Sequence, residues 1–280
     1  AYLQWIEQGA SAFRIDTIKH MPLGFWKSFS DRIRAQHPDF FLFAEAYDYN
    51  ADKIAPFTWP ENGKISVLDF PLKDKLDKAF GQQQAGYQIL EPALYLGSSP
   101  YQNAYELMTF YDNHDMPRLN ADDNGFIDAH NWLFTARGIP VIYYGSETGF
   151  MRGKAEHEGN RNYYGQARID AGAASPIYRS LQRIAEIRRH TIALQKGLQI
   201  NLLLDNDRAA FYRVYQHKGV NQSALVLLNK SGQAQEFSID ALVESGVWRS
   251  AISRKTSAIN KKNPRLSIRV PAHGVEVLTL

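Results

Sequence analysis

Cysteine is absent from the 280-residue sequence, which excludes disulfide bonds and thiolate metal sites. No apolar run approaches the roughly 20 residues that a membrane-spanning helix needs. The formal net charge is only +3, so we expect no nucleic-acid partner and no membrane partner. An initiator methionine and a signal-peptide pattern are also lacking, and the first ten residues, AYLQWIEQGA, resemble a helix end that Gly9 terminates. We therefore expect the chain to start inside a larger protein.

What the sequence does contain, over its first two-thirds, is an alternation of short apolar runs with helical patterns. The apolar runs are expected to be strands, at residues 13–16, 40–45, 66–70, 107–115 and 141–144. Helical patterns separate several of them, at residues 23–36, 73–80 and 127–137. Apolar strands separated by helices indicate a buried parallel sheet, so the predicted fold class is α/β. Several runs end in polar residues, at the edge where a (β/α)8 barrel builds its active site.

The pattern changes near residue 196, after a basic helical stretch at residues 178–190. Short runs with partial alternation follow, broken by turn sequences, at residues 198–204, 209–215, 224–229, 236–239 and 266–270. They predict a small antiparallel β-domain. We expect residues 1–195 to belong to a catalytic domain and residues 196–280 to do no chemistry. Lys230 is expected on the exposed face of this second domain.

Three segments place a carboxylate at or just past the end of an apolar run. They are FRIDTIKH with Asp16, FAEAY with Glu45 and FYDNHD with Asp115. Taken singly, each carboxylate is more often a helix N-cap, a solvated strand end, a turn former or half of a metal site. Three converging carboxylates can instead hydrolyse a glycosidic bond by double displacement. One attacks the anomeric carbon, one protonates the leaving oxygen, and the third binds sugar hydroxyls.

In this order and spacing the three motifs resemble the α-amylase superfamily, glycoside hydrolase family 13. The stretches RIDTIKHMPLGFWKSF, SVLDF and RGIPVIYYGSE are particularly similar to bacterial α-amylases and cyclodextrin glucanotransferases. The final PAHGVEVLTL resembles the closing strand of the family's C-terminal domain. The resemblance implies a (β/α)8 TIM barrel, with strands 4–8 in this chain, followed by a small antiparallel β-sandwich.

The resemblance also implies roles for individual residues. Asp16 is the expected nucleophile, Glu45 the general acid/base and Asp115 the transition-state stabiliser. The expected substrate-binding residues are Arg14, Lys19, His20, Tyr47, His114 and Arg161. The backbone carbonyl of His20 is an expected ligand of a structural calcium ion. The family usually has an aspartate a few residues before the arginine that Arg161 matches, whereas this sequence has His157 and Glu158.

The implied activity is hydrolysis of α-1,4-glucosidic bonds in starch, glycogen or maltooligosaccharides, which suggests a secreted or periplasmic protein. A transglycosylase of the cyclodextrin glucanotransferase type uses the same intermediate and is the first alternative. A non-catalytic carbohydrate-binding or partner subunit is the second, and the presence of all three carboxylates argues against it.

Part of the family pattern has no counterpart in the sequence. The motif of strand 3, strands 1–3, and the inserted B domain that supplies most calcium ligands are missing, so we expect an N-terminal half of the same protein as the partner of this chain. The starch-binding domains of the glucanotransferases are also missing after residue 280, which weighs against transfer. A barrel closes with eight strands, so we expect the chain by itself not to hydrolyse starch.

Overall fold

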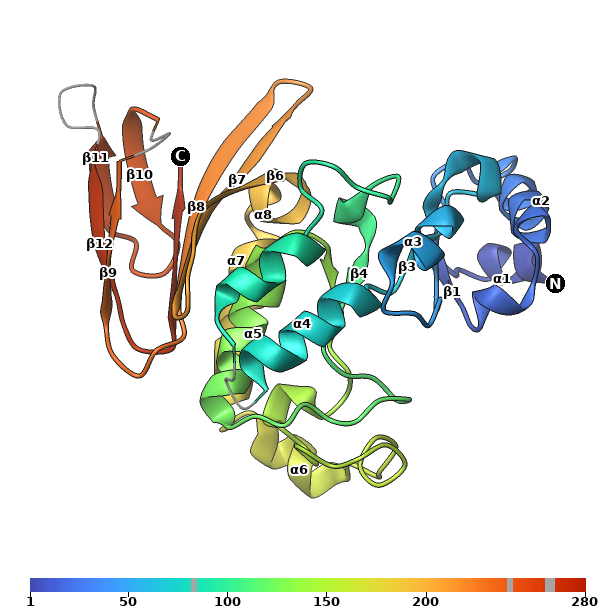
Figure 1. The fold of residues 1–280 in the computed structure, drawn as a ribbon, viewed down its shortest axis with the longest axis horizontal. Helices are drawn as coiled ribbons and strands as arrows, with labels where there is room; N and C mark the ends of the chain where they lie inside the picture. Colours follow the sequence, from blue (N-terminus) through green and yellow to red (C-terminus); the bar gives the residue numbers. More distant parts are fainter. Residues whose placement is uncertain (82–84, 241–243, 260–264) are drawn as a thin grey trace. The chain divides into compact units, whose positions relative to one another are not determined.

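The computed structural model describes residues 1–81, 85–240, 244–259 and 265–280. The chain forms two compact units, which are drawn in Figure 1. The first unit comprises Ala1–Asp74, Ala93–Phe110 and Gly138–Val141. The second unit comprises Lys75–Pro92, Tyr111–Arg137 and Ile142–Leu280. None of the described helices has the length and apolar character needed to cross a membrane.

The first unit contains five short parallel strands. Three of them form one sheet in the order β1 (Ala12–Ile15), β2 (Phe41–Ala44) and β3 (Ser66–Val67). Two more pair with each other, β4 (Met108–Thr109) and β5 (Ile139–Pro140). A single parallel bridge between Leu68 and Met108 connects the two sets, so the strands follow one another in chain order. This confirms the predicted parallel arrangement.

The fifth strand differs from its predicted position. The sequence predicts it at residues 141–144, whereas β5 ends at Pro140 and residues 141–144 lie outside any strand. Beyond β5, the Val141 amide donates to the Thr109 carbonyl at 2.8 Å. Gly138 has a φ of +100° and precedes β5 directly. An alanine there would place its Cβ 2.4 Å from Thr109 Cγ2, so the close approach of β4 requires a glycine.

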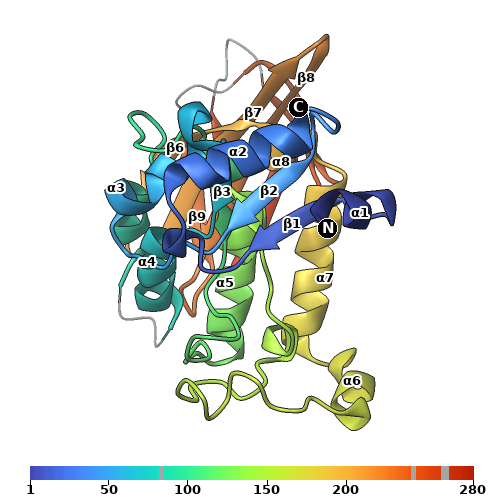
Figure 2. The same ribbon diagram turned by 90° about the vertical axis from the view of Figure 1, so that its right-hand side faces the viewer.

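Helices of the first unit pack against its strands, and residues of both form one buried apolar cluster. The α-helices are α1 (Tyr2–Glu7), α2 (Leu23–Arg34), α3 (Ala51–Ile54) and the start of α4 (Phe70–Phe80). The 3-10 turns include η1 (Ile18–His20), η2 (Ala55–Thr58), η3 (Pro60–Asn62) and η5 (Ala104–Glu106). Figure 2 shows α2 beside the strands, and its Trp26 and Ile33 share a buried cluster with Leu42 of β2. The cluster holds the strand ends in place by removing apolar surface from water.

The helical part of the second unit includes η4 (Tyr87–Ala93), α5 (Asp123–Thr135), η6 (Ser146–Thr148), α6 (Gln166–Gly172), α7 (Pro176–Arg189) and α8 (Ile192–Lys196). The helix α5 begins where the Asp122 carboxylate accepts a hydrogen bond from the Gly125 amide, as an N-cap does. It packs against α7, whose buried face carries Ile177, Ile184 and Ile187.

The rest of the second unit is antiparallel β-structure. Six strands form one sheet in the order β11 (Thr256–Ile259), β10 (Gly246–Ser250), β13 (Gly274–Thr279), β8 (Val220–Asn229), β7 (Arg208–His217) and β6 (Leu198–Leu204). The strands β12 (Leu266–Val270) and β9 (Gln235–Ile239) form a second sheet. One buried cluster contains residues from both sheets, among them Trp248, Leu227, Phe237 and Val270. The predicted strands are confirmed, and β10 and β11 are additional.

Lys230 does not lie on an exposed face, so that prediction is wrong. Its residue surface is 4% exposed, and its ammonium group donates to the carbonyls of Ala79 (3.2 Å) and Ala85 (2.6 Å). The Nζ atom also lies 5.9 Å from the ring centroid of Tyr87. Burial lowers the pKa of Lys230, and the two carbonyls replace the water that the ammonium group loses.

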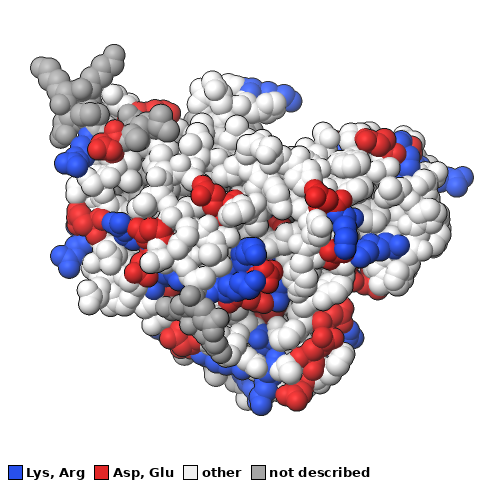
Figure 3. All heavy atoms as spheres, viewed as in Figure 1, with Lys and Arg blue, Asp and Glu red and all other residues white. Residues whose placement is uncertain are grey.

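Charged side chains of both signs lie next to one another on the face drawn in Figure 3.

Candidate active site

Asp16 and Glu45 directly follow two neighbouring parallel strands. The last residues of these strands, Ile15 of β1 and Ala44 of β2, are paired in the sheet. The Glu45 amide donates to the Ile15 carbonyl (2.9 Å), and the Ile18 amide donates to the Glu45 carbonyl (3.2 Å). Because the strands are parallel, their carboxyl ends meet at one edge, and backbone hydrogen bonds fix both carboxylate-bearing residues there.

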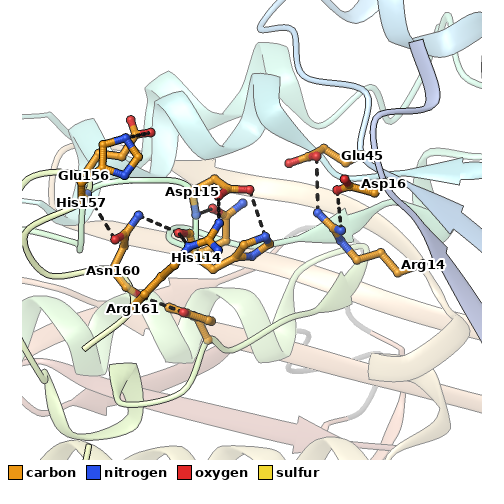
Figure 4. Close-up of polar contacts among 11 residues, drawn as sticks. Arg14, Asp16, Glu45, His114, Asp115, Glu156, His157, Asn160 and Arg161 are labelled. Carbon is orange, nitrogen blue, oxygen red and sulfur yellow. Dashed lines mark hydrogen bonds and ion pairs between the residues drawn. The ribbon is translucent and has the colours of Figure 1, made fainter. Parts of the chain in front are cut away.

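Arg14 bridges the two carboxylates. Its Nη1 donates to Asp16 Oδ1 at 2.8 Å, and its Nη2 lies 3.4 Å from Glu45 Oε2 (Figure 4). Arg14 and Asp16 are two residues apart, so their side chains share one face of the chain. Glu45 is 9% exposed, whereas the Asp16 side chain is 64% exposed. The buried carboxylate and the accessible one therefore share a single cation.

Lys19, His20 and Tyr47 lie at the same edge of the sheet. Lys19 donates from Nζ to the Tyr47 carbonyl at 3.0 Å and lies 3.5 Å from Asp48 Oδ2. This contact joins the segment after β1 to the segment after β2. The Tyr47 ring is half exposed and meets Phe70 edge-on, with centroids 5.1 Å apart. An accessible ring in a fixed orientation suits stacking against a sugar face.

In the second unit, the Asp115 carboxylate lies between the His114 imidazole and the Arg161 guanidinium. His114 Nε2 is 2.9 Å from Asp115 Oδ2, and Arg161 Nη2 pairs with the other oxygen, Oδ1 (Figure 4). The Asn113 side chain accepts a hydrogen bond from the Asp115 amide at 2.8 Å. Two loop side chains also donate to the His114 carbonyl, Asn160 from Nδ2 at 2.6 Å and Arg161 from Nε at 3.2 Å. The sequence did not predict this contact of Arg161 with Asp115.

Two buried residues of the FYDNHD motif fix the segment that leads to Asp115. The Tyr111 hydroxyl and His130 Nε2 form a hydrogen bond of 2.6 Å. The Asp112 carboxylate accepts from Ser146 Oγ at 2.9 Å and from the Leu119 amide at 3.2 Å. Burial raises the pKa of Asp112 to about 6, and the bond from Ser146 opposes this shift. Sequence analysis missed both residues as site residues, although they stand within the motif it singled out.

Comparison with known proteins assigns the family. The model of the α-amylase catalytic domain matches residues 1–175. The chain belongs to the α-amylase family. It is 27% identical to an α-amylase of Streptomyces lividans, over 99% of this chain and 34% of that protein. It is 30% identical to a cyclomaltodextrin glucanotransferase of Bacillus sp. (strain 38-2), over 82% of this chain and 32% of that protein. The chain thus spans about a third of the length of these curated relatives.

Solved structures of α-amylase-family proteins share the fold. The α-amylase of Geobacillus thermoleovorans, solved with acarbose, superposes with a TM-score of 0.82 at 22% identity, over 99% of this chain and 61% of that one. CldA, described as a cyclomaltodextrin glucanotransferase with a three-domain ABC distribution, gives a TM-score of 0.79 at 26% identity, over 99% of this chain and 58% of that one. The match of the α-amylase family model to residues 1–175 confirms the family resemblance inferred from the motifs.

Calcium is common in the α-amylase family, and the residues around His20 test whether it fits here. Calcium is bound by six to eight oxygen ligands, many of them carboxylates. The described part of the chain has no group of three or more His, Cys, Asp or Glu side chains that could hold a metal ion. The His20 carbonyl alone does not make a site, so we derive no step through calcium. A calcium contact at His20 remains a prediction.

Asp48 lies beside the candidate site, in contact with Lys19, and the sequence did not single it out. It lies three residues after Glu45, and both Lys19 and Lys53 approach its Oδ2 atom, at 3.5 Å and 3.4 Å. The hydrogen bond from the Asn50 amide is the main cause that lowers the pKa of Asp48. The available signal in the sequence was a second carboxylate three residues after Glu45.

Proposed function

We propose that this chain carries the catalytic carboxylates of a retaining α-amylase-type glycoside hydrolase that cleaves α-1,4-glucosidic bonds in starch, glycogen or maltooligosaccharides. The observation that carries the proposal is the contact of one guanidinium, that of Arg14, with both Asp16 and Glu45. Retaining enzymes keep their two carboxyl groups only about 5–5.5 Å apart, whereas inverting enzymes leave room for a water. Two carboxylates that share one guanidinium suit the short spacing.

In the proposed first step, an Asp16 oxygen attacks the anomeric carbon while the bond from that carbon to the leaving oxygen breaks. Glu45 gives its proton to the leaving oxygen, so the departing sugar leaves as a neutral alcohol. In the second step Glu45, now ionised, takes a proton from water, whose oxygen attacks the anomeric carbon and releases Asp16. Two inversions at one carbon retain the α-configuration.

The accompanying residues support these steps. Arg14 stabilises the ionised form of the nucleophile by its charge and its direct hydrogen bond. Asp115, with His114 beside it, is proposed to bind hydroxyls of the sugar at the cleavage point. Lys19, His20 and Tyr47 are proposed to bind the acceptor-side sugars, and Arg161 the donor side.

The proposed fold is the family's: strands 4–8 of a (β/α)8 barrel within residues 1–195, followed by a β-sandwich from residue 196. Five consecutive parallel strands support the first part. A core shared by the two antiparallel sheets supports the second. The proposed boundary, between residues 195 and 196, falls at the last residue of α8, two residues before β6 begins at Leu198. Secretion or export to the periplasm is proposed from the substrate class alone.

Transglycosylation is the second candidate. The chain is 30% identical to the glucanotransferase of Bacillus sp. (strain 38-2) and 27% identical to the amylase of Streptomyces lividans. CldA, which is named a glucanotransferase with three domains, aligns with 99% of the chain.

A product assay with maltoheptaose tests the proposal and separates the candidates. The protein that carries this chain is incubated with maltoheptaose, and the products are resolved by chromatography over time. Hydrolysis gives only shorter linear sugars, while transfer gives longer or cyclic ones. We expect Asp16→Asn to abolish both reactions. If the wild-type protein forms no product, or if Asp16→Asn forms products at the wild-type rate, the proposed function is wrong.

A further inference from the structure

Arg118 is a buried arginine of the second unit, three residues after Asp115. Its residue surface is only 2% exposed. Its Nε donates to the Gly159 carbonyl at 2.9 Å, and its Nη1 donates to the Tyr144 carbonyl at 2.7 Å. The two carbonyls belong to loop segments that are separated by 15 residues in the chain. One side chain therefore joins them.

The surroundings of Arg118 suit a guanidinium and not an ammonium group. The Cζ atom lies 4.4 Å from the ring centroid of Tyr143 and 5.0 Å from that of Tyr144. A planar cation stacks on aromatic rings and donates in several fixed directions at once, which lysine cannot do. Burying a charge is costly unless partners replace water, so these contacts are needed to hold Arg118 in the folded protein.

Arg118 holds the segment of residues 154–161, which we call the Asp115 loop, at two places. Its own backbone amide donates to the Lys154 carbonyl at 3.0 Å, at the start of the loop. Its guanidinium holds the Gly159 carbonyl near the other end. Within the loop, the amides of Glu158 and Gly159 donate to the Ala155 carbonyl, which closes a tight turn.

The end of the Asp115 loop reaches the candidate site directly. Asn160 and Arg161 follow Gly159, and both donate to the His114 carbonyl. Arg161 also pairs with the Asp115 carboxylate. The position of the Gly159 carbonyl thus fixes the two side chains that hold His114 and Asp115.

We propose that Arg118 is a positioning residue, which holds the Asp115 loop so that Asn160 and Arg161 orient His114 and Asp115. The expected effect of Arg118 on turnover rests on the proposed function, whereas its effect on the position of the Asp115 loop does not. A carboxylate that binds sugar hydroxyls in the transition state must be accurately placed, and a shift of about 1 Å can cost roughly 100-fold in rate.

Kinetics of Arg118→Lys test this role, with Arg152→Lys as the matched control. Arg152 donates to a loop carbonyl, that of Gly149, and its Cζ lies 5.4 Å from the Phe126 ring centroid. It also donates to the Ala121 carbonyl and the Asp123 carboxylate, and these partners all lie outside the Asp115 loop. We expect Arg118→Lys to lower kcat about 10- to 100-fold with KM within about threefold, because an interaction specific to the transition state is lost. Arg152→Lys should keep the wild-type kcat. A rise in KM at unchanged kcat, or equal losses in both variants, would overturn the proposal.

A double-mutant cycle tests the route through Arg161. If Arg118 acts through the loop end, Arg118→Lys combined with Arg161→Gln should be no slower than the slower single variant. Fully additive losses would show that Arg118 acts elsewhere. If Arg118→Lys does not fold, Asn160→Ala removes the bond to the His114 carbonyl and leaves the buried guanidinium in place. It should then give the same fall in kcat, and a wild-type kcat would count against the role of the loop.

Hydrogen exchange separates this inference from the proposed function. In wild-type protein the side-chain amide of Asn160 and the backbone amides of Glu158 and Gly159 should exchange slowly, because each donates a hydrogen bond. Arg118→Lys should accelerate all three, and Arg152→Lys should not. If the protein lacks activity on glucans but shows this pattern, the positioning role stands and the proposed function fails. Unchanged protection in Arg118→Lys would refute the role of Arg118 even in an active enzyme.

Discussion

Arg14 contacts Asp16 at 2.8 Å and Glu45 at 3.4 Å through the two terminal nitrogens of one guanidinium. The contact fixes the relative position of the proposed nucleophile and the proposed acid/base.

Replacing Arg14 by lysine should reduce activity although the charge is kept. An ammonium group cannot present two diverging donors to both carboxylates as the planar fork does. The loss of one charge-assisted contact costs about 1.5–3 kcal/mol, which corresponds to a fall of roughly 10- to 100-fold in kcat/KM. Steady-state kinetics on maltoheptaose measure it. A variant as active as wild type would show that the shared guanidinium is dispensable.

Replacing Glu45 by glutamine should lower turnover of maltooligosaccharides by about 100- to 10,000-fold, because the leaving oxygen loses its proton donor. A fluoride leaving group needs no protonation, so the loss should be much smaller for the glycosylation step with α-maltosyl fluoride. Single-turnover measurements on both substrates provide the comparison. Equal losses for the two would argue against Glu45 as the acid.

Asp112 should make stability depend on pH. Its pKa in the folded protein is about 6, above the ordinary 3.8, so the folded form takes up a proton between pH 6 and pH 4 that the unfolded chain does not. The contribution of Asp112 to the free energy of unfolding therefore increases as the pH falls through 6, by at most about 3 kcal/mol.

Asp112→Asn provides the reference for this effect, because asparagine does not titrate. Urea unfolding of wild type and variant at pH 7 and pH 5 gives the difference in unfolding free energy at each pH. Wild type should gain stability relative to the variant on going from pH 7 to pH 5. A difference that is independent of pH, or that changes in the opposite direction, would show that Asp112 is ionised throughout.

Lys230→Gln should destabilise the protein by about 1.5–3 kcal/mol, because two carbonyls lose a charged donor inside the structure. Lys255, which is exposed just before β11, provides the control, and Lys255→Gln should change stability by less than about 0.5 kcal/mol. Thermal unfolding of both variants tests the difference, and Lys255→Gln should also keep wild-type turnover. Identical melting curves for the two variants would be incompatible with a buried Lys230.

The position of the carboxylates could be predicted from the sequence because the signal is local. Asp16 and Glu45 each follow a run of apolar residues, and a buried parallel strand needs such a run. The run that leads to Asp115 was predicted as a strand over residues 107–115, whereas only Met108 and Thr109 pair as a strand there. In the segment that follows, the side chains of Tyr111 and Asp112 form hydrogen bonds with His130 and Ser146, which lie farther along the chain.

Residues whose role depends on distant partners could not be found in this way. Lys230 looks like an ordinary surface lysine in its turn sequence, and only the carbonyls of Ala79 and Ala85, about 150 positions away, make it a buried residue. The strand β10 has the sequence GVWRS, in which only Trp248 and Ser250 are buried, so its apolar pattern is too weak to predict a strand. Arg118 and Arg161 likewise acquire their partners only when the loops fold.

Trapping the covalent intermediate tests the central claim most directly. The protein that carries this chain is incubated with a fluorinated maltosyl fluoride, digested and analysed by mass spectrometry, and the anomeric form of the first product from maltoheptaose is followed by NMR. We predict a glycosyl ester on Asp16 and release of the α-anomer, in keeping with double displacement. Release of the β-anomer, or an ester on a residue other than Asp16, would contradict the account.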